Sequence, residues 1–121
     1  MTNESRDLVV VTHGIDHELS SVALTIALGG ITAGLKVSLF LTSGGVDLVR
    51  RGAADTTHVK PLDPLSDMFK DFLGRGGVIW ACPPCVKSRG YTQESLIDGV
   101  VIAGAAKMHE RIQAGAATLS F

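Results

Sequence analysis

Short apolar runs alternate with helical patterns along the chain, and this alternation constrains the fold more than any other feature. The runs are rich in aliphatic and β-branched residues and are predicted to be strands at 8–11, 36–41, 78–81, 100–103 and 117–121. Strands joined through helices form parallel sheets, because parallel neighbours need a long crossover connection. We therefore expect an α/β fold, a three-layer α/β/α sandwich with about five mainly parallel strands and helices on both faces.

Three helices are predicted between these strands. The first runs from about Asp16 to Ala33, with Gly34 beyond its end, and the last covers 104–114. For the middle helix, Asp63 is predicted to be the N-cap and Pro64 the first helical residue. Its apolar residues recur at helical spacing, at Leu65, Met68, Phe69, Phe72 and Leu73, and Gly74 ends it. Shorter helical pieces are expected at 46–51 and near 91–95, and 52–62 is expected to be irregular.

The first helix carries no charged residue between Leu19 and Leu35. The stretch is too short and too rich in Ser, Thr and Gly for a membrane span. Burial on nearly every face explains it better, with one side on the sheet and another on a second copy of the chain. Gly29 and Gly30 would allow a close approach there, so the sequence predicts a homo-oligomer.

Length and charge narrow the classes of function. The 121 residues fit one domain over 1–121, and a net charge of −1 gives no basic surface for nucleic acid or for an anionic membrane. The N-terminus, residues 1–7, is polar and lacks the apolar core of a signal peptide. We expect a cytoplasmic protein that acts on small molecules or other proteins, without a cofactor.

The only two cysteines follow the apolar run 78–81 as Cys82-Pro83-Pro84-Cys85. Cys82 is predicted to lie at the carboxyl edge of a parallel sheet, where ligands bind in such folds. Proline restricts the residue before it, so Cys82 and Pro83 should be extended and Pro84 should begin a helix. Cys82 would then be the more exposed sulfur and Cys85 the more sheltered one.

Two features favour a thiolate at this place. The N-terminus of a helix carries partial positive charge, and Lys87 and Arg89 add full charges nearby. In a reducing compartment, an exposed thiol pair is more often catalytic or metal-binding than structural.

Around these residues the sequence resembles the DsrE/DsrF-like family of sulfur-relay proteins. The likeness rests on Cys82 followed eight residues later by Gly90 in an Arg89-Gly90 pair, and it extends to 95–100 and 118–121. The resemblance implies that Cys82 carries a persulfide and that sulfur passes between donor and acceptor proteins, in tRNA thiolation or in sulfur oxidation. It leads us to expect a sulfur carrier in which Cys85 resolves or assists.

Other residues complete the candidate site. His13 ends the first predicted strand on the edge that carries Cys82, where it could act as an acid or base. Gly44 and Gly45 follow the second strand, and their loop could present N–H groups to an anion. Tyr91 could flank the cysteine pocket.

Two alternatives remain open from the sequence. The cysteine pair could be a thiol–disulfide oxidoreductase, in which both sulfurs are obligatory and no sulfur is carried. The chain could also be a non-catalytic oligomeric module, with or without zinc bound by His13, His17, Cys82 and Cys85.

Overall fold

The sheet has five strands, and every neighbouring pair is parallel. The computed structural model describes residues 7–14 and 16–121; residues 1–6, most of the polar N-terminus for which no signal peptide is predicted, and residue 15 lie outside the described part. The strands are β1 (Asp7–Thr12), β2 (Lys36–Leu41), β3 (Val78–Ala81), β4 (Val100–Ile102) and β5 (Ala117–Ser120). Their order in the sheet is β4-β3-β2-β1-β5.

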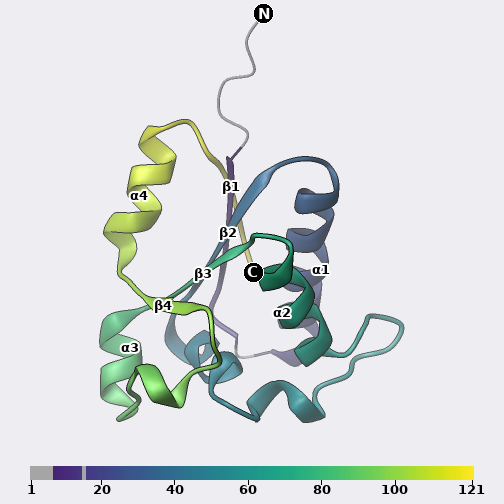
Figure 1. Cartoon of the computed structure of the whole chain (residues 1–121), viewed down its shortest axis with the longest axis vertical. Helices are drawn as coiled ribbons and strands as arrows, with labels where there is room; N and C mark the ends of the chain where they lie inside the picture. Colours follow the sequence, from purple (N-terminus) through teal and green to yellow (C-terminus); the bar gives the residue numbers. More distant parts are fainter. Residues whose placement is uncertain (1–6, 15) are drawn as a thin grey trace, which may run out of the picture.

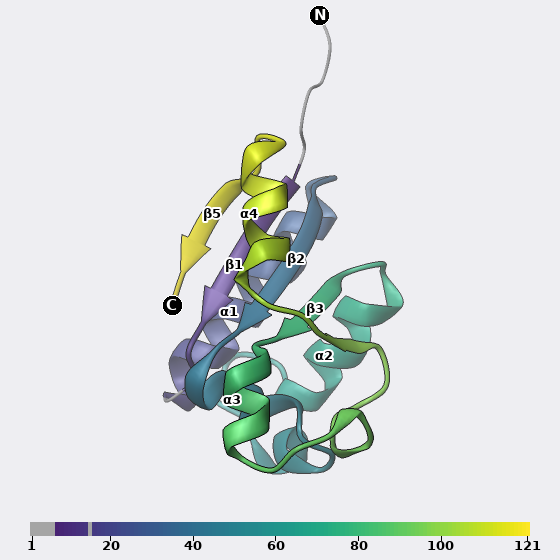
Figure 2. The same ribbon diagram turned by 90° about the vertical axis from the view of Figure 1, so that its left-hand side faces the viewer.

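Helices cover both faces of this sheet. Helices α1 (His17–Thr32) and α2 (Leu65–Gly74) lie together on one side, and α4 (Ala105–Gln113) lies alone on the other (Figure 1). The predicted three-layer α/β/α sandwich is therefore confirmed. A short helix, α3 (Pro83–Ser88), lies at the end of the sheet toward which the strand arrows point (Figure 2).

The main core lies between the sheet and the α1/α2 layer. Alternate residues of the strands point into it, among them Val10, Leu39 and Ile79, and they meet Leu24 of α1 and Phe72 of α2. All five of these side chains are fully buried. Because the side-chain period of a strand is two, the intervening residues face the α4 layer.

The α4 layer covers its face only in part. Phe40 and Trp80 are 6% and 5% exposed beneath it, and the Arg111 guanidinium lies 6.0 Å from the centre of the Trp80 ring. Val101, on the neighbouring strand, remains 50% exposed. No residue of α4 itself is buried. The core that stabilises the chain is therefore mainly the α1/α2 side.

Helix α1 begins and ends as predicted. Asp16 is its N-cap, and the Oδ1 atom of Asp16 accepts hydrogen bonds from the N–H groups of Glu18 and Leu19. The side facing the sheet is buried, including Leu24, Ala27 and Gly30. The opposite side is partly open, and Leu19 is 43% exposed. Burial on nearly every face does not occur within one chain, so a covering partner stays a prediction.

Helix α2 begins one residue later than predicted. Pro64 is the N-cap, with an extended ψ of 138°, and no side chain caps the helix. The prediction of Asp63 as cap was therefore wrong. The Leu65 N–H donates instead to the backbone carbonyl of Thr57, so this first amide already has a partner. Gly74 ends the helix as predicted.

Within the described residues, three 3₁₀ helices occupy connections between the other elements. They are η1 (Ser43–Val49), η2 (Ala53–Thr56) and η3 (Gln93–Ser95). The helical piece expected at 46–51 starts earlier, at Ser43, and 52–62 contains η2 and is not wholly irregular. Among the described residues, no helix has both the length and the apolar character needed to cross a membrane.

Candidate functional site

The cysteines lie where two neighbouring strands end side by side. Leu41 of β2 and Ala81 of β3 are paired, and the Cys82 N–H donates to the Leu41 carbonyl at 2.9 Å. This bond carries the ladder one residue past β3. The loop after β2 and the cysteine segment therefore begin from adjacent positions on the carboxyl edge of the sheet.

Helix α3 starts directly after Cys82. Cys82 is the N-cap, with an extended ψ of 122°, and Pro83 and Pro84 are the first two helical residues. The expectation that Pro83 is extended was wrong. The Val86 N–H donates to the Cys82 carbonyl at 2.9 Å, and this first-turn bond requires the residues between them to be helical. The prolines fit there because the first amides of a helix have no partner within it.

The two sulfur atoms are in contact. Both cysteines are free and half-buried, and their Sγ atoms lie 3.2 Å apart. The expected contrast between an exposed Cys82 and a sheltered Cys85 is not evident, because both belong to the same burial class. What distinguishes the two sulfurs is the set of donors around them.

Cys85 has polar contacts with the loop that follows β2, which comprises Thr42 and the start of η1, residues 43–45. The Ser43 N–H donates to the Cys85 Sγ at 3.1 Å, and the Thr42 hydroxyl lies 3.7 Å from the same atom. Ser43 has a φ of 51°, in the left-handed region that a residue with a side chain seldom adopts. An unusual backbone conformation thus aims this N–H at the sulfur.

These contacts divide the pair electrostatically. Burial and then the hydrogen bond with Cys85 raise the pKa of Cys82 above its ordinary value. Burial alone would do the same at Cys85, but the hydrogen bonds with Cys82 and from the Ser43 N–H outweigh it and lower the pKa of Cys85. The Thr42 hydroxyl and the charge of Arg89 act in the same direction. The more acidic thiol is therefore Cys85.

Asp47 of η1 links that helix to α3. Its carboxylate accepts a hydrogen bond from the Tyr91 hydroxyl and forms an ion pair with the Arg89 Nε at 3.2 Å. Arg89 also donates from Nη1 to the Cys85 carbonyl at 3.2 Å. The hydrogen bond to Asp47 is the main cause that raises the pKa of Tyr91. Arg89 and Tyr91, both predicted as site residues, thus hold the cysteine helix against the loop after β2.

Gly44 and Gly45 follow β2 and were predicted to form an open turn that binds an anion. The structure shows a different arrangement. Gly45 is buried, and its N–H donates to the Thr42 carbonyl at 2.8 Å, so it is not directed at a ligand. A Cβ added to Gly14 would lie 2.4 Å from the Cα of Gly45. The loops after β1 and β2 are therefore in backbone contact. Gly44 is half-buried beside Ser43.

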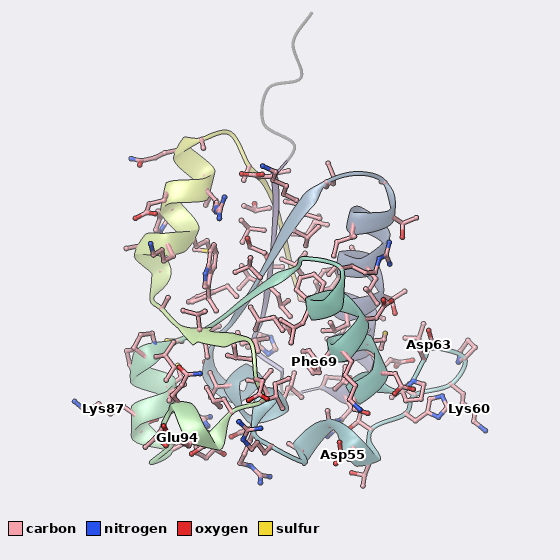
Figure 3. All side chains as sticks on the ribbon, viewed as in Figure 1. Asp55, Lys60, Asp63, Phe69, Lys87 and Glu94 are labelled. Atoms are coloured by element: carbon pink, nitrogen blue, oxygen red, sulfur yellow. The ribbon has the colours of Figure 1, made fainter. Side chains whose placement is uncertain are left out.

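The remaining predicted residues stay outside the sulfur contacts. His13 is exposed, and in the described part of the chain no hydrogen bond joins its ring to either cysteine. Lys87 is exposed and points outward from α3 (Figure 3). His17 contacts Thr57 through Nδ1 at 3.3 Å. Within residues 7–14 and 16–121, no three side chains of His, Cys, Asp or Glu gather as a metal site, so the proposed Cys₂His₂ set is not assembled.

Three residues of the site were not singled out from the sequence. The sequence drew attention to 42–45 as a loop, but it did not single out the hydroxyl of Thr42 or the amide of Ser43. Asp47 carried no signal, because its role depends on contacts with Arg89 and Tyr91, which lie 42 and 44 positions away.

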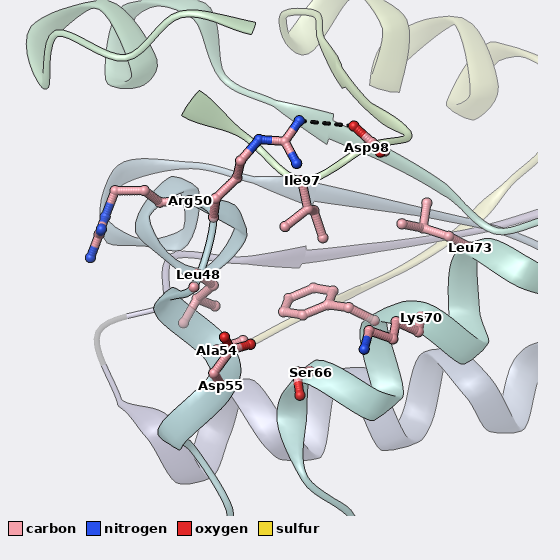
Figure 4. Close-up of a pocket in the computed structure, with 12 residues that line it drawn as sticks. Leu48, Arg50, Ala54, Asp55, Ser66, Lys70, Leu73, Ile97 and Asp98 are labelled. Carbon is pink, nitrogen blue, oxygen red and sulfur yellow. Dashed lines mark hydrogen bonds and ion pairs between the residues drawn. The ribbon is translucent and has the colours of Figure 1, made fainter. Parts of the chain in front are cut away.

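Two cavities lie near this edge, and neither is lined by a cysteine. One of about 370 Å³ is bordered by Gly14, His17, Gly44, Asp47 and Arg50, among others. Another of about 320 Å³ lies between η2, α2 and the loop before β4. Figure 4 shows this second cavity with Leu48, Leu73 and Ile97 around it and the Arg51–Asp98 ion pair, 2.8 Å long, at its rim.

Comparison with known sequences shows which family this chain is similar to. The sequence profile described as "DsrE/DsrF-like family" matches residues 7–121. An uncharacterized protein of Methanocaldococcus jannaschii is 31% identical over 90 residues, which cover 74% of this chain and 73% of that protein. An uncharacterized protein of Methanopyrus kandleri is 30% identical over 95 residues, 78% of this chain and 73% of that protein.

Solved structures share the same fold. A protein of unknown function from Methanobacterium thermoautotrophicum superposes with a TM-score of 0.75 at 19% identity, over 95% of this chain and 98% of that one. The YchN protein of E. coli gives a TM-score of 0.74 at 22% identity, over 97% and 99% of the two chains. At these identities the likeness shows the fold alone.

Proposed function

The chain belongs to the DsrE/DsrF-like family, whose members generally act in sulfur relay, and we propose that it carries sulfane sulfur as a persulfide on Cys82. One observation supports this proposal most directly. Two free, half-buried thiols touch at 3.2 Å on the carboxyl edge of the sheet, and one of them, Cys85, accepts a hydrogen bond from the Ser43 N–H. Such surroundings favour a thiolate, which is the form of cysteine that attacks sulfur.

The carrier reaction needs no cofactor. A thiolate attacks the outer sulfur of a donor persulfide, the sulfur–sulfur bond of the donor breaks, and the donor leaves as a thiolate. One sulfur–sulfur bond forms for each that breaks, so there is no net oxidation. An acceptor thiolate then removes the same sulfur from Cys82, and Cys85 assists the exchange from 3.2 Å away.

The proposal includes the setting in which the chain works. Its partners are sulfur donors and acceptors, either proteins or small sulfane-sulfur compounds, in a reducing cytoplasm where the pair stays in the thiol form. It works as a homo-oligomer, with the open side of α1 covered by a second copy. The spacing of Leu19, Val22, Ile26 and Gly29 supports this, because these uncharged residues recur at helical intervals and are exposed or half-buried.

An intact-mass experiment tests the carrier function. The reduced protein is incubated with inorganic polysulfide, freed of excess reagent and weighed without reductant. We expect a gain of one sulfur atom, found on Cys82 by peptide mapping and lost on treatment with a thiol reductant. Cys82→Ser should no longer deliver sulfur to an acceptor thiol. The carrier function is contradicted if wild type gains no mass, or if the double variant Cys82→Ser/Cys85→Ser gains as much.

The sulfur contact also favours a second candidate, a thiol–disulfide oxidoreductase. Sulfurs 3.2 Å apart need little movement to form a disulfide, and a dithiol exchanges with a disulfide substrate through a mixed disulfide. In that case both single serine variants abolish the activity, and the protein retains no sulfur after exposure to polysulfide. Reduction of a small disulfide by the wild type, without retained sulfur, would favour this candidate.

A further inference from the structure

We propose that Cys85 is the thiolate that first takes sulfur from the donor, and that the Ser43 N–H and the Thr42 hydroxyl form the binding site for its anion. This inference rests on the proposed carrier function and divides it into two steps. Cys85 receives the sulfur, and Cys82 carries it onward. The resemblance of the sequence to its family points to Cys82 alone, so the role of Cys85 comes from the contacts around it.

The first argument is that the start of α3 supplies few donors of its own. Anions are stabilised near helix starts by the free N–H groups of the first turn. Here the first two helical residues are Pro83 and Pro84, which have no N–H. The helix is also only six residues long. The backbone hydrogen bond that the Cys85 Sγ accepts comes from another part of the chain, the Ser43 N–H, whereas the Cys85 N–H of α3 acts on Cys82.

The second argument is that the loop after β2 supplies such donors to one sulfur. The Ser43 N–H and the Thr42 hydroxyl converge on the Cys85 Sγ at 3.1 Å and 3.7 Å. With the Cys82 Sγ at 3.2 Å, three polar groups surround this atom. The hydrogen bond from the Ser43 N–H favours the charged form of the sulfur that accepts it. The lowered pKa of Cys85 and the raised pKa of Cys82 agree with this division.

The third argument is that the donor geometry is held by packing. Ser43 keeps its left-handed φ of 51° between Thr42, whose N–H donates to the Thr12 carbonyl, and Gly45, which lies against Gly14. Neighbouring strands therefore fix the loop on both sides of Ser43. A left-handed residue with a side chain persists where its surroundings determine it, and such residues cluster at functional sites.

The charged groups near Cys85 support the same assignment. Arg89 donates to the Cys85 carbonyl, and its charge favours the thiolate. The carboxylate of Asp47, from η1, is paired with Arg89 and hydrogen-bonded to Tyr91. Lys87 is exposed and points outward from α3 (Figure 3). The Asp47 carboxylate is thus engaged by Arg89 and Tyr91.

The two steps balance in atoms and electrons. The Cys85 thiolate attacks the outer sulfur of a donor persulfide, so Cys85 becomes a persulfide and the donor leaves as a thiolate. The Cys82 thiolate then attacks that outer sulfur, which transfers to Cys82 and regenerates the Cys85 thiolate. The second step is favoured kinetically because a thiol of lower pKa is the better leaving group. The two sulfurs are already in contact for this transfer.

The order of the cysteines is tested by loading rates. Wild type, Cys85→Ser and Cys82→Ser are mixed with limiting polysulfide near neutral pH, quenched at intervals and weighed. We expect Cys85→Ser to load about tenfold more slowly or worse, since an ordinary thiol is only a few per cent ionised there. Cys82→Ser should load at nearly the wild-type rate and fail to deliver. Equal loading by Cys85→Ser and wild type would overturn the inference.

Three further variants test the anion site. Ser43→Val should slow loading because a β-branched residue does not tolerate the left-handed backbone. Ser43→Gly keeps the N–H and the conformation, so it should recover most of the rate lost in Ser43→Val. Thr42→Val should slow loading about threefold near neutral pH, through a smaller fraction of thiolate. The control is Thr118→Val on the exposed strand β5, and thermal melting verifies that each variant folds.

A measurement that uses no sulfur donor separates this inference from the carrier function. Alkylation of the single-cysteine variants by iodoacetamide is followed as a function of pH. Cys85, in Cys82→Ser, should react with a midpoint at lower pH than Cys82, in Cys85→Ser. If wild type takes up no sulfur but this order holds, only the carrier function fails. If wild type takes up sulfur and the order is reversed, only the role given to Cys85 fails.

Discussion

The backbone N–H of Ser43 donates to the Sγ atom of Cys85, although the two residues are 42 positions apart in the chain. The contact exists because β2 and β3 are neighbours in the sheet and end at the same level. A short segment follows each strand at this edge of the sheet. The segment after β2 contains the Ser43 donor, and the segment after β3 contains the Cys85 sulfur. The chemistry of the site therefore follows from strand pairing.

The thiol pair should titrate in two steps. Because the hydrogen bonds lower the pKa of Cys85 and burial raises that of Cys82, the wild-type protein should show one thiolate forming below the ordinary thiol range and one above it. These values belong to the pair, since the sulfurs are in contact. Ultraviolet absorbance of the thiolate during a pH titration measures them. A single step that accounts for both thiols would contradict the asymmetry.

Tyr91 should make the fold sensitive to alkaline pH. Its folded pKa is raised by Asp47, so its contribution to stability is present below the unfolded pKa, about 10, and is lost as pH rises through the folded value. Chemical denaturation across that range should show wild type losing stability faster than Tyr91→Phe. If the two proteins lose stability in parallel, the Tyr91–Asp47 bond does not act in this way.

Gly14 should tolerate no side chain. Its φ of 70° costs alanine about 1–2 kcal/mol, and the Cβ would lie 2.4 Å from the Gly45 Cα, which adds about 1–3 kcal/mol of overpacking. Gly34 provides a matched control, since it has a φ of 95° with no atom within 4 Å of the added Cβ. Urea denaturation should show that Gly14→Ala loses clearly more stability than Gly34→Ala. Equal losses would mean that the two loops can separate at little cost.

The open side of α1 should be an interface between copies. Light scattering at micromolar concentration should show an oligomer for wild type. Val22→Glu should dissociate it, because a partner would bury the new carboxylate without a counter-charge. Thr56→Glu, an exposed position on η2, serves as the control. If wild type is a monomer, or if Val22→Glu leaves the oligomer intact, then a second copy does not cover the open side of α1.

Most of the fold could be predicted because its signals are local. The five strands are short apolar runs, and the first helix is a largely uncharged stretch between Asp16 and Gly34, so these elements agree closely with the structure. The start of α2 was misplaced since a tertiary bond, from the Leu65 N–H to the Thr57 carbonyl, satisfies the amide that a cap would serve. The start of α3 was misplaced since a first-turn bond from Val86 outweighs the preference of Pro83.

The site could be predicted only in part. The edge of the sheet and both cysteines follow from the sequence, but the partners of each sulfur do not, because Ser43, Asp47 and Arg89 meet only after the strands pair. The helix terminus was expected to stabilise the thiolate, yet its two prolines remove two of the amides that would do so. His13 shares the edge without contacting the sulfurs, since strand position fixes a backbone and leaves the side chain's direction open.

The double proline at the start of α3 makes the reactivity of Cys85 a reporter of tertiary structure. A thiol activated by its own helix stays activated whenever that helix forms, whereas this one depends on the Ser43 amide at the start of η1. Heat, denaturant or a bound molecule that loosens the segment after β2 would lower the reactivity of Cys85 before the sheet itself unfolds. Alkylation kinetics at that sulfur would then register the first stage of unfolding.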